Sequence, residues 1–318
     1  MDAERKGSRA REAYKKIVLV TRKTRLAGLV ERFNTEAQAR FYIEHAGGDF
    51  IEYQNENDAY RRSLDLVRRS IDLGLKVQLI DRELVPTYSF LAEDLVVTLG
   101  QDGLVANTAK YVGRQPIVAV NPDPGRFDGV LLPFLPGQLA AVLEEVLSGQ
   151  FRVWTITLAE AKLNDGQRLL AFNDLFIGAR THVSALYRIR WNHDQEAQSS
   201  SGILVSTGAG TTGWMSSVFN MASGVAHLAG GNEVRPIRIG WEDPRLLFVV
   251  REPFVSRHSS ARLIAGIVEK QQSLDVESLM PTGGVIFSDG VESDYLQFNS
   301  GAIVRIGAAQ ERAHLVIG

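Results

Sequence analysis

Short apolar runs alternate with helical patterns between residues 16 and 120, and this alternation limits the chain to few folds. Apolar side chains recur at spacings of four, three and four from Tyr60 to Ile71, and residues 103–112 form a second helical pattern. Four runs rich in Val, Ile and Leu predict strands at residues 16–21, 75–80, 94–98 and 116–120, and the first is typical of a parallel strand buried on both faces. The alternation predicts βαβ units in a doubly wound parallel sheet, whose ligands bind at the carboxyl ends of the strands.

The pattern changes after Gly149, where short strands separated by turn residues dominate. A single helix is expected at residues 213–228. The predicted strands cover residues 151–163, 167–172, 184–191, 203–206, 245–250, 261–268, 284–288 and 302–306. We therefore expect an α/β domain over residues 1–148 and a β-rich, sandwich-like domain over residues 149–318.

Charge and composition exclude several classes of protein. The 35 basic and 37 acidic residues give a net charge of −2, which argues against a nucleic-acid or membrane-surface binder. There is no cysteine, and the six histidines show no metal-ligand spacing, so we predict no protein-bound metal site. Residues 1–16 are charged without an apolar core, and no apolar run reaches the roughly 18 residues of a membrane span. A cytoplasmic enzyme or binding protein is expected.

The loop after the predicted strand 94–98 is the strongest candidate for a phosphate site. It has the sequence Gly100-Gln-Asp-Gly103, in which two glycines flank Asp102 and a helix follows. Glycines at a strand end let backbone amides face a phosphate, and a carboxylate there can accept a proton from a hydroxyl. Alternatively, this is an ordinary strand-to-helix turn whose aspartate caps the helix.

A second candidate loop follows residues 203–206. Its glycines at 208, 210 and 213 have the spacing of a dinucleotide-binding loop, but they lie in the strand-rich half of the chain. Hydroxyl groups from Thr207 and Thr212, with Trp214 just beyond, suit a loop that wraps a polar ligand at a helix N-terminus. A Gly/Thr-rich turn without a ligand is the alternative.

Two further loops carry polar groups at predicted strand ends. The pair Asn173-Asp174 can bind the two hydroxyls of a ribose, although Asn-Asp is also a common turn dipeptide. Asn121 begins the sequence Asn-Pro-Asp-Pro-Gly after the strand 116–120. This segment predicts first a rigid turn and second a ligand-binding loop.

Taken in order, these segments resemble the NAD kinase family. Gly100-Gln-Asp-Gly103 corresponds to its GGDG loop, and the segment 202–214 to its DGL-x-VSTPTGSTAY stretch, in which Ser201 takes the place of the first aspartate. The resemblance is closer to the mitochondrial-type branch, whose N-T-D-P-x-x-x-x-G, N-E-V-F-I-G, L-L-F-x-x-R-E-P and F-N-D-G-A-I motifs have counterparts at residues 121–129, 173–178, 246–253 and 298–303. The match runs from about residue 16 to the C-terminus.

The resemblance implies a Rossmann-like N-terminal domain, a β-rich NAD-binding domain and an active site between them. The reaction would transfer the γ-phosphate of ATP, or of another phosphate donor, to the 2′-hydroxyl of NAD(H), with Mg²⁺ bridging the phosphates. Asp102 would be the base, in a cytoplasmic homodimer or higher homo-oligomer. The binding residues carried over or inferred from the loops are Gly100, Gly103, Asn121, Asn173, Asp174, Thr207, Thr212 and Trp214.

Four positions depart from the family pattern. Gln101 replaces the second glycine of GGDG, and Leu104 replaces the threonine that usually follows the loop. Asp174 is one methylene shorter than the usual glutamate, and Ser201 stands where the third motif begins with aspartate. A Cβ at position 101 is costly if the backbone there needs a positive φ, and Leu104 removes a hydroxyl that could contact phosphate or metal.

Two other functions fit the same residues. One is a related kinase that acts on a sugar or lipid hydroxyl, and the other is a catalytically weak protein that binds dinucleotides. Asp102 and Asn173 favour an enzyme, whereas Gln101 and Leu104 favour the binding protein.

Overall fold

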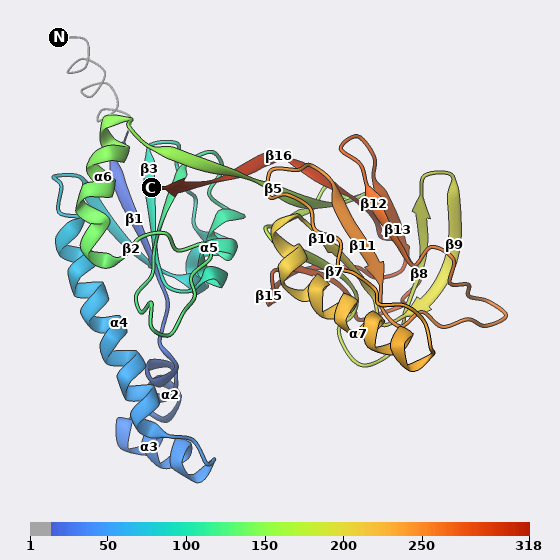
Figure 1. Ribbon diagram of the computed structural model, residues 1–318, viewed down its shortest axis with the longest axis horizontal. Coiled ribbons are helices and arrows are strands. Elements are labelled where there is room, and N and C mark those ends of the chain that lie inside the picture. Colours follow the sequence, from blue (N-terminus) through green and yellow to red (C-terminus); the bar gives the residue numbers. More distant parts are fainter. Residues whose placement is uncertain (1–13) are drawn as a thin grey trace. The chain divides into compact units, whose positions relative to one another are not determined.

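The computed structural model describes residues 14–318 and divides the chain into two compact units (Figure 1). The first unit extends to Trp154 and takes in His314–Gly318, and the second comprises Thr155–Ala313. The C-terminal end of the chain thus returns to the first unit. Most of the charged stretch that argues against a secretory signal, residues 1–13, lies outside the described residues.

The first unit contains the parallel sheet that the sequence predicts. Its strands lie in the order β2-β1-β3-β4, and residues His314 and Leu315 of β16 (Ile303–Ile317) pair in parallel with β4. The strands are β1 (Lys16–Thr21), β2 (Lys76–Asp81), β3 (Asp94–Leu99) and β4 (Pro116–Val120). Every residue of β3 and of β4 is buried, as expected for strands covered on both faces.

Helices cover this sheet. Their bounds are α2 (Arg25–Phe33), α3 (Glu36–His45), α4 (Phe50–Ser70), α5 (Asp102–Ala109) and α6 (Leu139–Ser148). Val67 of α4 and Leu143 of α6 belong to one core with Leu19 and Val97 of the sheet. The helix predicted from Tyr60 to Ile71 is the second half of a longer helix, α4, that begins at Phe50.

The second unit is built from antiparallel sheets, so the mixed α/β fold class is confirmed. One sheet has six strands in the order β12-β11-β10-β7-β14-β15, and in the other β13 pairs with β16 and β8, and β8 with β9. Large buried side chains such as Tyr187, Phe248 and Phe298 fill its core. The strands are β5 (Arg152–Leu163), β6 (Arg168–Ala171), β7 (Asp174–Ala179), β8 (Ala185–Trp191), β9 (Asp194–Ser200), β10 (Ile203–Ser206), β11 (Leu246–Val250), β12 (Ala265–Val268), β13 (Leu274–Ser278), β14 (Gly284–Ser288) and β15 (Val291–Gln297).

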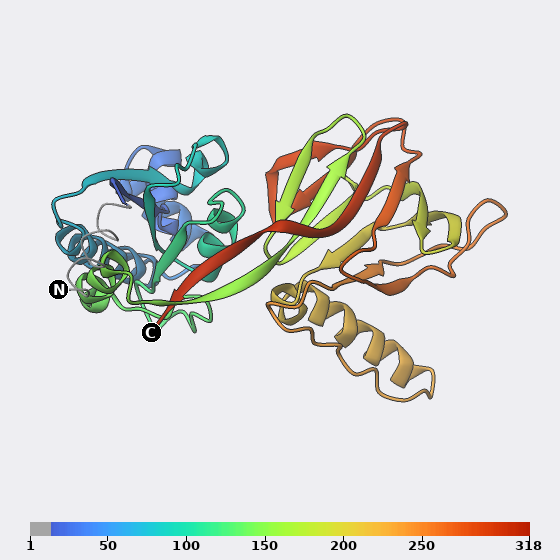
Figure 2. The same cartoon turned by 90° about the horizontal axis from the view of Figure 1, so that it is seen from above.

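The helix α7 (Trp214–Leu228) lies along the six-stranded sheet (Figure 2). Met215 of α7 packs against Leu204 of β10 and Leu247 of β11. These side chains lie on the opposite face of the sheet from Phe248, because successive residues of a strand point to opposite sides. The sheet therefore separates the main core of the unit from the smaller cluster under α7.

A buried carboxylate holds the segment that precedes β12. Glu196 of β9 accepts hydrogen bonds from the backbone amides of Arg262 and Leu263, at 3.0 and 2.9 Å, and from the Ser260 hydroxyl at 2.6 Å. Burial alone would raise its pKa, but these bonds and one from Gln198 outweigh burial and lower the pKa to about 2. Glu196 is therefore a charged anchor inside the second unit.

We expect Glu196→Gln to lower the free energy of unfolding at pH 7 by about 1–3 kcal/mol, because an amide cannot accept all these donors. The folded-state pKa lies below the unfolded value, so the stabilisation is present above about pH 4.5 and is lost as the pH falls towards 2. Urea denaturation at pH 7 and pH 3 measures both effects. Glu93→Gln, at an exposed pair with Lys15, is the control and should change little. Equal losses at both pH values would contradict the charged anchor.

Candidate functional site

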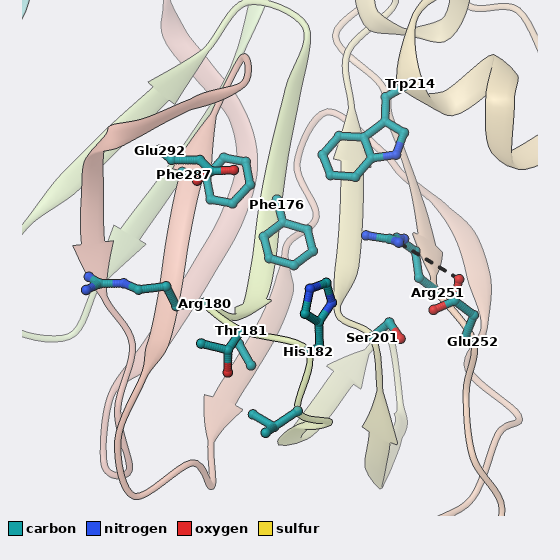
Figure 3. A pocket seen from close by; sticks show the side chains of 12 residues that line it. Phe176, Arg180, Thr181, His182, Ser201, Trp214, Arg251, Glu252, Phe287 and Glu292 are labelled. Atoms are coloured by element: carbon teal, nitrogen blue, oxygen red, sulfur yellow. Dashed lines mark ion pairs between the residues drawn. The ribbon is translucent and has the colours of Figure 1, made fainter. Parts of the chain in front are cut away.

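A pocket of about 390 Å³ opens on the six-stranded sheet of the second unit (Figure 3). Its walls combine aromatic rings with basic and acidic side chains. The lining residues are Phe176, Ala179, Arg180, Thr181, His182, Val183, Ser201, Trp214, Arg251, Glu252, Phe287 and Glu292. Trp214 belongs to the predicted binding residues, and we call this cavity the Trp214 pocket.

Aromatic rings form one wall of the Trp214 pocket. The rings of Phe176 and Trp214 are nearly parallel, with centroids 5.8 Å apart and an interplanar angle of 15°. Phe287 packs against Phe176 at 4.9 Å. Two glycines make room for the Phe176 ring, because a Cβ at Gly178 or Gly202 would lie 2.6 or 2.7 Å from its carbons. The spacing of these two glycines thus follows from packing around one ring.

Arg251 places a positive charge against this aromatic wall. Its guanidinium carbon lies 5.3 Å from the Trp214 ring centre and 6.0 Å from that of Phe176, within the range of cation–π attraction. The guanidinium also forms a loose ion pair with Glu252 at 3.8 Å (Figure 3). A long ion pair leaves donors for a ligand, so the pocket can hold a flat ring that carries an anionic group.

Asn173, Asp174 and Thr207 are brought together beside this sheet. The Thr207 backbone amide donates to the Asn173 carbonyl at 2.9 Å, and Asp174 is paired with Ser206 in the ladder between β7 and β10. Asp289, in the turn after β14, accepts hydrogen bonds from the backbone amides of residues 172–174 at 3.0, 2.6 and 3.2 Å. The carboxylate of Asp289, which is far from these residues in the sequence, therefore fixes the backbone of the predicted ribose site.

The Asp174 side chain is buried, and its Oδ1 has no hydrogen-bond partner among the described residues. Burial raises its pKa to about 7, a hydrogen bond from Ser206 opposes this, and the nearby charge of Asp289 adds to it. The Oδ1 atom of such a carboxyl group can accept a hydrogen bond from a hydroxyl. This property fits the predicted role in ribose binding.

The first two glycines of the 208–213 loop are required by packing. A Cβ at Gly208 would lie 2.1 Å from the Gly240 carbonyl oxygen, and one at Gly210 would lie 2.3 Å from that of Asn173. Thr212 is exposed, with its hydroxyl 3.3 Å from the Ala209 carbonyl, and it does not line the Trp214 pocket. Packing alone therefore explains why residues 208 and 210 are glycines, without a bound ligand.

In the first unit, the Gly100–Gly103 loop lies where β3 meets α5. Gln101 has φ −94° and ψ 168°, an extended conformation that any residue adopts, so its Cβ adds no backbone strain. Gly100 has no room for a side chain, because a Cβ would lie 2.7 Å from Leu104 Cδ2, whereas Gly103 has nothing within 4 Å of its position. Leu104 thus packs beneath the loop in place of the hydroxyl.

Asp102 and Asn121 both hold the segment that follows β4. Asp102 Oδ1 accepts a hydrogen bond from the Leu131 backbone amide at 2.6 Å, while the helix cap itself is Gln101. Asn121 donates from Nδ2 to the Phe127 carbonyl at 3.1 Å and accepts from the Asp123 amide at 3.0 Å. Both predicted residues therefore form hydrogen bonds with the loop of residues 121–131.

A buried ionic cluster next to this loop was not predicted. Arg22, which follows β1, pairs with Glu56 at 3.2 Å, and both side chains are less than a tenth exposed. Tyr60 accepts a hydrogen bond from the Arg22 amide and donates to the Leu99 carbonyl, both at 3.1 Å, and burial raises its pKa to about 12. The cluster ties the ends of β1 and β3 together. Periodicity placed Tyr60 on the buried face of a helix but could not show these partners.

Within residues 14–318, no group of three or more His, Asp or Glu side chains is arranged to hold a metal ion. No helix in the same part of the chain is long and apolar enough to cross a membrane.

The raised pKa of Asp174 leads to a pH-dependent stability prediction. In the folded protein the pKa of Asp174 is about 7, above the ordinary aspartate value of 3.8. Ionisation of Asp174 therefore destabilises the fold as the pH rises from 3.8 to about 7. Asn keeps the site neutral at every pH. We expect the melting temperature of Asp174→Asn, relative to the unmodified protein, to be at least about 2 °C higher at pH 8 than at pH 5. A difference that does not change with pH would show that Asp174 titrates normally.

No protein-family model matches the chain. Part of it is similar to curated NAD kinases. It is 27% identical over 143 residues to the NAD kinase of Psychrobacter arcticus, covering 42% of this chain and 44% of that protein. It is also 27% identical over 126 residues to the NAD kinase of Chlorobium phaeobacteroides strain BS1, covering 38% of this chain and 43% of that protein. Each match therefore spans less than half the length of the relative.

Solved structures resemble the chain over nearly its whole length. Yeast NADH kinase complexed with NADH has a TM-score of 0.59 at 17% identity and covers 95% of this chain and 83% of its own. An NAD kinase from Archaeoglobus fulgidus in complex with ATP has a TM-score of 0.51 at 18% identity, covering 94% of this chain and 92% of its own. The chain therefore has the fold of these kinases, and less than half of its sequence is similar to curated NAD kinases.

Proposed function

We propose that this protein is an NAD(H) kinase that transfers the γ-phosphate of ATP to the 2′-hydroxyl of the adenosine ribose of NAD or NADH. One observation carries the proposal: the same six-stranded sheet bears a buried carboxyl group and an aromatic, cationic pocket. The carboxyl group is that of Asp174, whose Oδ1 has no partner among the described residues, and the pocket is the Trp214 pocket. Similarity to known proteins supports it, since the curated relatives are NAD kinases. We also propose the mitochondrial-type branch, on the motifs at residues 121–129, 173–178, 246–253 and 298–303.

The second unit would bind the dinucleotide. Asp174 would accept a hydrogen bond from a ribose hydroxyl, with Asn173 and Thr207 beside it. Trp214 would stack against a base, and Arg251 would offset phosphate charge. Thr212 is carried over from the family motif and has an exposed hydroxyl that a ligand can reach.

The first unit would supply the phosphate loop and the base. Gly100 and Gly103 would leave backbone amides at the N-terminus of α5 open to the donor phosphates, with Asn121 shaping the neighbouring loop. Asp102 would take the proton of the 2′-hydroxyl. The 2′-oxygen of the ribose would then bond to the γ-phosphorus as the bond from this phosphorus to ADP breaks. Mg²⁺ would arrive with the triphosphate, because it is commonly held by substrate phosphates and one or two carboxylates.

A catalytically weak dinucleotide-binding protein is the second candidate. The buried Leu104 supplies no hydroxyl beneath the loop, and one Asp102 oxygen is already engaged by the Leu131 amide. Formation of NADP or NADPH from NAD(H), Mg²⁺ and ATP or polyphosphate separates the two functions. Binding of NADH without turnover of any donor would favour the second. A cytoplasmic location and a homo-oligomeric state remain predictions from the sequence.

We expect Asp102→Asn to lower kcat by about 10²- to 10⁴-fold, because an amide cannot accept the proton of the hydroxyl. The dissociation constant for NADH should change little, since Asp102 lies in the first unit and the proposed dinucleotide residues lie in the second. Asp128→Asn, at an exposed aspartate of the neighbouring loop, is the matched control and should retain activity. Full activity in Asp102→Asn would show that another group acts as the base.

We expect Trp214→Ala to weaken NADH binding by about 5- to 100-fold, because a base loses its stacking partner. Isothermal titration calorimetry measures this effect. Trp154→Ala removes an exposed tryptophan that does not line the pocket, and should leave the affinity unchanged. Equal affinities of both variants and the unmodified protein would exclude the Trp214 pocket as the dinucleotide site.

A further inference from the structure

The parallel sheet of the first unit changes direction between β1 and β3. The chain passes from β1 to β2 on one side of β1, and then places β3 on the other side of β1. Open α/β sheets bind their ligands outside the carboxyl ends of two strands that diverge in this way. Arg22 directly follows β1, and Gly100 directly follows β3. Both residues therefore lie at the place where the topology favours a ligand.

The hydroxyl group of Tyr60 fixes Arg22 relative to the Gly100–Gly103 loop. It accepts a hydrogen bond from the Arg22 backbone amide and donates one to the Leu99 carbonyl, both at 3.1 Å. The Arg22 side chain lies next to the loop, since its Cδ is 3.6 Å from the point that a Cβ at Gly100 would occupy. The guanidinium carbon is 5.7 Å from the ring centres of both Tyr60 and Phe127. Arg22 is therefore held in place before any ligand binds.

The guanidinium of Arg22 has more hydrogen-bond donors than the protein satisfies. Its terminal nitrogens donate to Glu56 at 3.2 Å and to the Lys23 carbonyl at 3.3 Å, which uses two of the five N–H groups of the side chain. Nε is buried and has no partner among residues 14–318. Buried donors nearly always have an acceptor, and a guanidinium matches the oxygens of a phosphate. The unsatisfied donors indicate that a ligand oxygen binds beside Arg22.

The helix α5 adds backbone donors at the same strand ends. It begins at Asp102, and within residues 14–318 no side-chain hydrogen bond caps its N-terminus. No atom lies within 4 Å of the position of a Cβ at Gly103, so open space adjoins the first turn of the helix. The N–H groups of a helix N-terminus attract anions, and a nearby arginine adds a full positive charge. Two separate parts of the chain thus supply the features of an anion site.

We propose that Arg22 binds the phosphates of the nucleoside triphosphate donor, together with the backbone amides at the start of α5. The inference rests on the proposed kinase function and adds the positive charge that the phosphate loop lacks, because Gly100-Gln-Asp-Gly103 contains no basic residue. Phosphoryl transfer depends on fixed positive groups that stabilise charge on the phosphate oxygens. Arg22 is then a binding residue, and its ion pair with Glu56 orients the guanidinium.

A purely structural role for Arg22 leads to a different expectation. Arg22 and Glu56 form a buried ion pair, and removal of either partner leaves the other charge buried with fewer partners. If the pair only stabilises the fold, the two substitutions should affect ligand binding alike. If Arg22 binds phosphate, they should have opposite effects, because the negative charge of Glu56 competes with the phosphate for the guanidinium.

The experiment measures binding of inorganic tripolyphosphate to the full chain by isothermal titration calorimetry, in the absence of NAD(H). We expect Arg22→Gln to weaken binding by about tenfold or more, because charge-assisted hydrogen bonds are lost. Glu56→Gln should strengthen binding by at least about twofold. Arg25→Gln is the matched control: Arg25 is the other arginine paired with Glu56, is 44% exposed, and should change the affinity little.

Two results would overturn the proposal. One is that the unmodified protein does not bind tripolyphosphate, and the other is that Arg22→Gln and Glu56→Gln change the affinity equally. The double variant Arg22→Gln/Glu56→Gln removes both buried charges and should bind as weakly as Arg22→Gln. It replaces the single variant if circular dichroism shows that Arg22→Gln is unfolded.

Kinetics separate this inference from the proposed function. With NAD(H) as acceptor, Arg22→Gln should raise the KM for ATP by about tenfold or more, because the loss affects donor binding. The dissociation constant for NADH should stay the same, since the proposed dinucleotide residues lie in the second unit. An unchanged KM for ATP in an active enzyme would refute the role of Arg22 alone. Tripolyphosphate binding through Arg22 without phosphorylation of NAD or NADH would refute the proposed function and leave the phosphate site intact.

Discussion

The arrangement of the second unit's site depends on the carboxylate of Asp289. It accepts hydrogen bonds from three consecutive backbone amides at residues 172–174, at the junction of β6 and β7. Three donors on one carboxylate restrict the conformation of that junction far more than a single bond would. The charge of Asp289 also helps to raise the pKa of Asp174, after burial. One side chain therefore positions the predicted ribose-binding residues and adds to the rise that burial causes in the pKa of Asp174.

Close packing within the protein explains several glycines in the motifs that resemble the kinase family. Gly178 and Gly202 leave space for the Phe176 ring, and Gly208 lets its segment approach the Gly240 carbonyl. These clearances place Phe176 against Trp214 and Trp214 at the start of α7. In the first unit, Gly100 is kept by Leu104, which packs against it. The sequence suggested a phosphate loop at Gly100 and a ligand-binding loop at Gly208 and Gly210, but steric contacts within the protein are sufficient reasons for all three glycines.

The fold was predictable where local composition decides the structure. The runs at 16–21, 94–98 and 116–120 are buried strands because β-branched and aliphatic side chains suit a sheet covered on both faces. The strand β9 (DQEAQSS) was not predicted, since its polar sequence is held by pairing with β8. The first half of α4 was missed because polar residues there obscure the helical period. Asp289 could not be found either: its partners lie more than 100 residues earlier in the chain.

The Trp214 pocket and a second, apolar cavity between α7 and the six-stranded sheet follow from the alternation of side chains along β11. Leu247 and Val249 point towards α7, whereas Phe248 points into the main core. Where the strand ends, the chain turns through Arg251 and Glu252, and these two residues reach both cavities. On one side they meet Trp214 and Phe176, where a guanidinium and aromatic rings suit a charged, planar ligand. On the other they border only apolar side chains. A single turn therefore separates a pocket of aromatic and charged side chains from an apolar one.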